Sequence, residues 1–86
     1  MLFMVIERFK ERGAKQVGER FKQKGRMLPE GVTYIESWMD PSGAFCYQIV
    51  DSPNRELLDE WMSGWDDLVQ FEVVPVVRSE EFWRKE

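Results

Sequence analysis

A strand, a helix and a strand follow one another twice in this chain of 86 residues, and few folds accommodate that order. Apolar residues at helical spacing predict a helix at about Ala14–Lys24 and a second between Asp51 and Leu68, with a short terminal helix at Ser79–Trp83. Runs rich in β-branched and aromatic residues predict four strands, at Leu2–Arg8, Val32–Asp40, Ala44–Asp51 and Val69–Arg78. The β-α-β-β-α-β order is that of the ferredoxin-like split motif, an antiparallel four-stranded sheet with both helices on one face. We therefore expect a single ferredoxin-like α+β domain over residues 1–86.

The turn between the two central strands sets the expected register of the sheet. Asp40, Pro41 and Gly43 occupy positions that these residue types favour in a type I turn, and Gly43 can take the positive φ of a bulged hairpin. If Asp40 lies opposite Ala44, one face of the hairpin holds Tyr34, Glu36, Trp38, Cys46, Gln48 and Val50. The other face is more apolar and is expected to meet the helices; it holds Ile35, Ser37, Met39, Phe45, Tyr47 and Ile49.

The two outer strands are assigned to faces by their apolar residues. In the first strand Leu2, Met4 and Ile6 form the uninterrupted apolar set and are expected to face the helices. That assignment leaves Phe3, Val5 and Glu7 on the open face. In the last strand the residues expected to face the helices are Phe71, Val73, Pro75 and Val77, which leaves Glu72, Val74 and Val76 on the open face.

Local signals mark the helix ends and suggest how the helices pack. Ser52 is a favourable N-cap for the second helix, and Gly25 suits the end of the first. Gly18 costs the first helix roughly 1 kcal/mol relative to alanine, and we expect close packing on the sheet to explain it. Trp61 and Trp65 are four residues apart on one helix face, so core or interface packing is expected for both.

The apolar content exceeds what one small core hides. Of the residues, 43% are hydrophobic and 14% aromatic, and a short chain buries a smaller share of its surface than a long one. Because the strands are apolar on both faces, we expect a homodimer formed through the open sheet face. Nothing in the sequence approaches a signal peptide or a membrane span, and the single cysteine, Cys46, fits a reducing compartment. A cytoplasmic protein without membrane attachment is expected.

Histidine is absent from the sequence, which excludes several chemistries. The chain has no imidazole base, no Ser-His or Cys-His pair and no imidazole metal ligand. With one cysteine as well, a structural zinc site is not expected. Cys46 has no adjacent basic residue, so we expect a buried, inert thiol. We predict neither a metal nor a cofactor.

Candidate site residues gather on the expected open face. Glu7, Glu36 and Glu72 are expected to converge there, and carboxylates in an apolar pocket resist ionising together, which raises a pKa and favours acid/base chemistry. The alternative is that they pair with arginine or lie in water at strand ends. Trp38, Trp61 and Trp65 are alternatively expected to line a flat hydrophobic pocket. Tyr34 and Tyr47 either donate to a ligand oxygen or satisfy a nearby carbonyl within the fold. The candidate ligand-binding residues are Glu7, Tyr34, Glu36, Trp38, Gln48 and Arg26.

Basic residues are concentrated at the start of the chain. Eight of the 12 lie within residues 1–26, whereas the rest of the chain is acidic. A solvated helix face explains such a run. The alternative is that Arg20, Lys24 and Arg26 hold an acidic ligand near the Met27–Gly31 loop.

One strand invites comparison with RNA-binding domains. Gly43–Tyr47 resembles, in part, the Gly/aromatic strand by which RRM domains stack RNA bases, but it lacks the basic residue before the glycine. Phe45 and Tyr47 are expected to face the helices, and the domain is acidic overall. We predict that the protein does not bind nucleic acid.

Four segments resemble an uncharacterised family of short bacterial proteins in the dimeric α+β-barrel superfamily. They are Met1–Glu7, Gly25–Val32, Ser37–Asp40 and Phe71–Val76. The resemblance implies two ferredoxin-like subunits that press their open sheet faces together into a barrel. The superfamily includes cofactor-independent monooxygenases, haem-degrading enzymes and muconolactone-isomerase-like proteins, many of which use a histidine that this chain lacks. No site residue carries over from the family.

We expect a homodimer that binds a small, partly apolar molecule. One alternative is a structural or interaction module whose core is filled by its own side chains. Another is a cofactor-free enzyme, monooxygenase- or isomerase-like, that acts on an aromatic or enolisable substrate. An unfilled cavity reached by Glu7 or Glu36 favours the ligand-binding and enzymatic alternatives, and a solid core favours the module.

Overall fold

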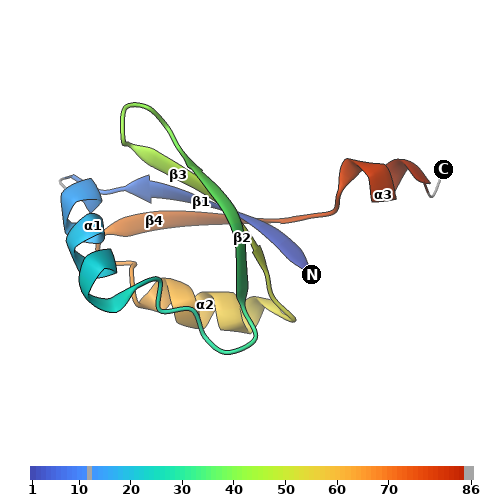
Figure 1. Cartoon of the computed structure of the whole chain (residues 1–86), viewed down its shortest axis with the longest axis horizontal. Coiled ribbons are helices and arrows are strands. Elements are labelled where there is room, and N and C mark those ends of the chain that lie inside the picture. Colours follow the sequence, from blue (N-terminus) through green and yellow to red (C-terminus); the bar gives the residue numbers. More distant parts are fainter. Residues whose placement is uncertain (12, 85–86) are drawn as a thin grey trace.

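A computed structural model describes residues 1–11 and 13–84 and has the expected element order. The described residues form four strands, β1 (Leu2–Phe9), β2 (Thr33–Met39), β3 (Phe45–Asp51) and β4 (Val69–Val76), and three helices, α1 (Gly13–Lys24), α2 (Arg55–Ser63) and α3 (Ser79–Arg84) (Figure 1). The sheet order is β2-β3-β1-β4, and every neighbouring pair is antiparallel. This architecture confirms the ferredoxin-like α+β fold. Arg12, Lys85 and Glu86, which belong to the expected domain of residues 1–86, lie outside the described residues.

The core lies between α2 and one face of the sheet. Leu58 of α2 and Val5, Val50 and Val69 of the strands are fully or almost fully buried, and Trp61 packs with them. Burying an aliphatic side chain of this size stabilises the fold by roughly 1.5–3 kcal/mol. The expected core position of Trp61 on the helical stripe is confirmed, and Trp65 and Leu68, which follow α2, are buried in the same cluster.

The hairpin register differs from the expected one by one residue. The amide of Asp40 donates to the carbonyl of Phe45 at 2.9 Å, so Asp40 lies opposite Phe45 rather than Ala44. Gly43 has a positive φ, as expected, with a value of 81°. The loop between the two strands is one residue longer than predicted. Side chains alternate along a strand, so this shift inverts all of β3. Cys46, Gln48 and Val50 face the helices, and Phe45, Tyr47 and Ile49 face away.

Strand β2 agrees with the prediction at one end only. Ser37 and Met39 lie on the helix side as expected, with Glu36 and Trp38 on the open side. A bulge between Tyr34 and Glu36 then changes the alternation. It brings Tyr34 to the same face as Ser37, and the two hydroxyl groups lie 2.7 Å apart. The expected open-face position of Tyr34 is therefore wrong.

Strand β1 is inverted as well. Phe3, Val5 and Glu7 are buried beneath the helices, whereas Leu2, Met4 and Ile6 lie on the open face. The reason is pairing: Phe3 lies opposite Val50 and Val5 opposite Gln48, and paired residues share a face. In β4 the expected faces of Phe71 and Val73 are confirmed, because both pack against the core. Val77 lies beyond the end of β4 and is exposed.

Two local predictions about the helices have different outcomes. Gly25 follows α1 with a φ of 67°, and its amide bonds to the Phe21 carbonyl at 2.8 Å, as expected for a helix end. The N-cap of α2 is Asn54 and not Ser52, because the Asn54 side chain accepts from the Leu57 amide at 2.9 Å. Ser52 is buried and bonds instead to the Asn54 carbonyl.

The C-terminal helix α3 lies away from the sheet. Figure 1 shows it at the end of an arm that continues from β4, on the opposite side of the molecule from α1. Its Phe82 and Trp83 are 51% and 66% exposed and contact each other edge to face. Among residues 1–11 and 13–84, none of the helices has the length and apolar character needed to cross a lipid bilayer.

Candidate functional site

A cavity of about 420 Å³ lies between α1 and the helix-facing side of the sheet. Its walls are mostly apolar, and Phe21 and Met39 are both about half exposed where the cavity meets solvent. The volume falls in the range of small-molecule sites. The lining residues are Glu7, Phe9, Ala14, Val17, Gly18, Phe21, Arg26, Ser37, Met39, Cys46, Gln48, Trp61 and Trp65.

Glu7 places a carboxyl group in this apolar wall. The residue is only 8% exposed because β1 carries it beneath the helices. Burial raises the pKa of Glu7 to about 7, while a hydrogen bond from Gln48 and the positive charge of Arg26 oppose that rise. Removing a carboxylate from water disfavours its charged form. Near neutral pH, Glu7 therefore exists in both protonation states.

Gln48 connects Glu7 to Arg26. Its amide nitrogen donates to a Glu7 carboxyl oxygen, and its amide oxygen accepts from Arg26 Nε at 3.2 Å. Both polar ends of the Gln48 side chain are thus occupied, which fixes the amide orientation. The acid and the cation are separated by one amide group and do not form a direct ion pair.

Arg26 is held in place by aromatic side chains. Its guanidinium carbon lies 3.6 Å from the ring centre of Tyr34 and 5.3 Å from that of Phe21. The Arg26 carbonyl accepts from the indole nitrogens of Trp61 and Trp65, at 3.0 and 3.1 Å. These contacts combine stacking with backbone anchoring, so the guanidinium is pre-positioned at the cavity.

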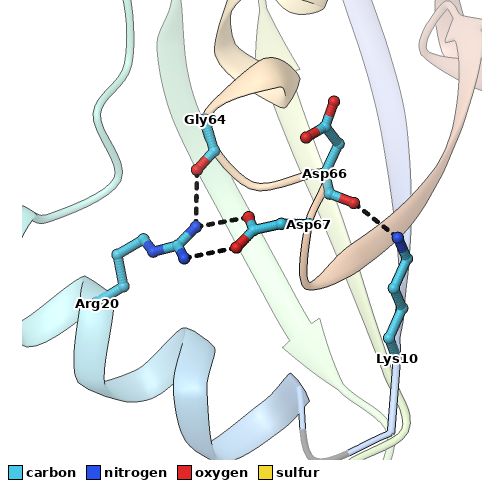
Figure 2. Close-up of polar contacts among 5 residues, drawn as sticks. All are labelled: Lys10, Arg20, Gly64, Asp66 and Asp67. Carbon is cyan, nitrogen blue, oxygen red and sulfur yellow. Dashed lines mark hydrogen bonds and ion pairs between the residues drawn. The ribbon is translucent and has the colours of Figure 1, made fainter.

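A second arginine fixes α1 beside the cavity. Figure 2 shows Arg20 of α1 donating two hydrogen bonds of 2.8 Å to the Asp67 carboxylate and a third of 3.0 Å to the Gly64 carbonyl. Lys10 bonds to the Asp66 carbonyl in the same segment. The bidentate geometry ties α1 to the segment after α2. The hydrogen bonds from Arg20 lower the pKa of Asp67.

Gly18 borders the cavity instead of packing closely. A Cβ atom at this position would meet no other atom within 4 Å. The expectation that Gly18 permits close contact between α1 and the sheet is therefore wrong. The close approach in α1 occurs at Gly13, where a Cβ atom would lie 2.7 Å from the Leu68 carbonyl oxygen.

The six predicted site residues are distributed over two faces of the sheet. Glu7, Gln48 and Arg26 line the cavity, and Tyr34 lies against Arg26. Glu36 is exposed, and Trp38, 54% exposed, is on the open face, so neither residue reaches this cavity. Trp61 and Trp65 line the cavity, as the pocket alternative from the sequence predicts, and they are also part of the core. Met39 lines the cavity as well and was expected only to face the helices.

Cys46 also lines the cavity. Burial and the nearby Glu7 charge raise the pKa of the Cys46 thiol to about 11, against a smaller opposing effect of Arg26. The thiol is therefore protonated at neutral pH and a poor nucleophile. Within residues 1–11 and 13–84, no three cysteine, aspartate or glutamate side chains gather to hold a metal ion.

The fold and the site define a ferredoxin-like α+β domain with a cavity that holds a buried carboxyl group. A family model described as a domain of unknown function, DUF3303, matches residues 1–85, and the chain belongs to that family. No curated protein and no solved structure matches the chain. The expected membership of a family without an assigned function is thereby confirmed, and the superfamily placement stays a prediction.

Proposed function

We propose that this domain binds a small, partly apolar molecule in the cavity between α1 and the sheet. The observation that carries the proposal is the buried Glu7 carboxyl, placed among apolar walls and bonded to Gln48. Burying an ionisable group without a direct ion pair costs stability. A cost of this kind is commonly retained where the group contacts a ligand.

The cavity also favours ligand binding over a self-filled core. Phe21 and Met39 lie at its opening and remain about half exposed, so they leave the space between α1 and the sheet unfilled. A site of this volume encloses most of the surface of a small ligand. The apolar walls supply affinity, and the few polar groups fix the orientation of the bound molecule.

A fragment screen by NMR tests the proposal. The indole N–H groups of Trp61 and Trp65 both bond to the Arg26 carbonyl at the cavity wall, so their resonances report on its occupant. Trp38 lies on the open face and serves as an internal control. We expect apolar fragments with one polar group to shift the Trp61 and Trp65 signals and leave that of Trp38 unchanged.

Two matched variants locate the binding event. Gly18→Leu places a bulky side chain at the cavity, where a Cβ atom meets open space. Lys22→Leu adds a side chain of the same type to an exposed position of α1 outside the cavity lining. Loss of fragment binding in the first variant alone supports the proposal. Equal binding in both variants refutes it.

Proton-transfer catalysis is the second candidate function. A carboxyl group whose pKa lies at about 7 is suited to general acid/base chemistry at neutral pH. This supports a cofactor-free enzyme acting on an enolisable substrate, with Glu7 as the proton carrier. Solvent deuterium exchange into a bound carbonyl fragment tests it, and Glu7→Gln is expected to abolish the exchange.

We also propose that two chains associate through the open sheet face. That face carries a continuous apolar surface from three strands, with Tyr47 beside Trp38 and Ile49 opposite Met4. An exposed apolar surface of this kind favours association, at roughly 25 cal/mol per Å² removed from water. The exposed aromatic side chains of the α3 arm add to the apolar surface available to a second copy. The arrangement corresponds to a dimeric α+β barrel.

A further inference from the structure

We propose that the occupant of the cavity is an apolar monocarboxylate, whose carboxylate binds Arg26 while Glu7 takes up a proton. This inference rests on the proposed function and specifies the chemical class of the ligand. It comes from the arrangement of three polar groups, Arg26, Gln48 and Glu7, in an otherwise apolar wall.

The guanidinium of Arg26 retains hydrogen-bonding capacity. Its Nε donates to Gln48, while its two terminal nitrogens form no hydrogen bond with the described residues. No carboxylate of residues 1–11 and 13–84 lies within ion-pair distance of it. A guanidinium presents paired donors in the geometry that a carboxylate accepts. The cation that Tyr34 and Phe21 hold at the cavity is therefore available to an anionic group.

Glu7 adds a proton-dependent contact. Gln48 bonds to Glu7 through its nitrogen and to Arg26 through its oxygen, so both ionisable groups lie one amide group apart. A ligand carboxylate beside Arg26 would be repelled by an ionised Glu7. A protonated Glu7 can instead donate its O–H to the ligand. Binding of an anion thus favours protonation of Glu7.

Few other charges act on Glu7. Arg26 faces it from the loop after α1, and Cys46 faces it from β3 with a thiol that stays protonated at neutral pH. The cavity residues of α1 are not titratable, and Trp61 and Trp65 are likewise uncharged. The pKa of Glu7, raised by burial to about 7, places its proton uptake in the accessible pH range.

The remaining walls define the body of the ligand. Phe9, Val17, Phe21, Met39, Trp61 and Trp65 present aromatic and aliphatic surface. The open cavity of about 420 Å³ between them fits an aromatic or branched aliphatic group. One carboxylate on such a group satisfies Arg26, the cation that the described residues place in the lining, without leaving a second charge buried.

Three probes of similar shape and different charge test the inference. They are 1-naphthylacetate, its neutral amide 1-naphthylacetamide, and the cation 2-(1-naphthyl)ethylamine. At pH 6 we expect the carboxylate to bind at least about tenfold more tightly than the amide, in line with the strength of a charge-assisted hydrogen bond. Between pH 6 and pH 8 its affinity should fall about tenfold as Glu7 ionises. The affinity of the amide should change little.

Two variants separate the contributions of the two groups. Glu7→Gln should retain carboxylate binding and lose its pH dependence. Arg26→Gln should reduce carboxylate binding to the level of the amide, and retained amide binding shows that the variant is folded. If the amide or the amine binds as tightly as the carboxylate at pH 6, the inference is wrong and the proposed function stands. If neither the probes nor the fragments bind, both the inference and the proposed function are wrong.

Discussion

The side-chain amide of Gln48 donates a hydrogen bond to the carboxyl group of Glu7 beneath α1. Glu7 lies on β1 and Gln48 on β3, and the antiparallel pairing of these strands brings both side chains to the helix-facing side of the sheet. The bond compensates only part of the cost of burying the acid, because the pKa of Glu7 stays raised to about 7.

The first prediction concerns stability against pH. The pKa of Glu7 is raised from 4.5 to about 7, so between these values the folded chain holds a proton that the unfolded chain releases. The free energy of unfolding therefore falls as pH rises through this window, by up to about 3 kcal/mol. Relative to the parent protein, Glu7→Gln should raise the free energy of unfolding by this amount at pH 8 and leave it unchanged at pH 4, as measured by urea unfolding. Glu36→Gln, at an exposed position, is the matched control, and an equal gain in both variants would refute the account.

The second prediction concerns the two glycines of α1. Gly18→Ala should stabilise the domain by about 0.5–1 kcal/mol, because alanine favours the helix and its Cβ meets no atom. For a domain of this size a gain of 1 kcal/mol raises Tm by about 4–8 °C. Gly13→Ala should destabilise, since its Cβ would lie 2.7 Å from the Leu68 carbonyl oxygen. A Tm of Gly18→Ala below that of the parent protein would instead support close packing of Gly18 on the sheet.

The third prediction concerns the reactivity of Cys46. Because the pKa of its thiol is raised from 9.0 to about 11, the thiolate fraction at neutral pH falls about 100-fold. Alkylation by iodoacetamide should be about tenfold or more slower than that of the same cysteine in guanidinium, because the greater nucleophilicity of the more basic thiolate offsets part of the loss. Mass spectrometry of timed samples measures both rates. Comparable rates in the folded and unfolded chain would contradict the raised pKa and the partial burial of Cys46.

The fourth prediction concerns association. Sedimentation at micromolar concentration should give about twice the chain mass of 10.3 kDa. Ile49→Arg places a charge on the open face and should yield a monomer, since desolvating an unpaired charge is costly. Gln23→Arg on the exposed side of α1 should remain dimeric. A folded, monomeric parent protein would overturn the proposed barrel.

The fifth prediction is that the domain does not bind RNA. The observed register places Phe45 and Tyr47 on the open face, so their expected position toward the helices no longer speaks against base stacking. The charges of that face still disfavour RNA, because the exposed Glu36 and Glu72 oppose one exposed cation, Arg8, whereas the cations of α1 lie on the other side. A fluorescence titration with single-stranded RNA at low salt should show no binding. Micromolar, salt-sensitive binding would assign the open face to RNA rather than to a second copy.

The sequence predicts the order of elements well because periodicity and turn residues act locally. It does not predict which residues of the strands face the helices. One extra loop residue between Asp40 and Phe45 exchanges the two faces of β3. The inversion extends to β1, whose apolar residues occupy both alternating sets and give no independent signal. The bulge between Tyr34 and Glu36 likewise has no glycine or proline to mark it.

Part of the candidate site is predictable from the sequence for a related reason. Alternation along the strands puts Glu7 and Gln48 on one face of the sheet, and the pairing of β1 with β3 keeps them together whichever face that is. Glu36 and Trp38 were separated from them by the shift of β2 against β3. The contact of Arg26 with Gln48 depends on the path of the loop after Gly25, which no local pattern specifies.

The central claim is that the cavity beside Glu7 binds a small molecule. A crystal structure of the protein grown with the tightest-binding fragment tests it most directly. We predict density for the fragment between α1 and the sheet, within hydrogen-bonding distance of Glu7 or Arg26. A fragment bound only on the open sheet face, or a cavity closed by Phe21 and Met39, would contradict the claim.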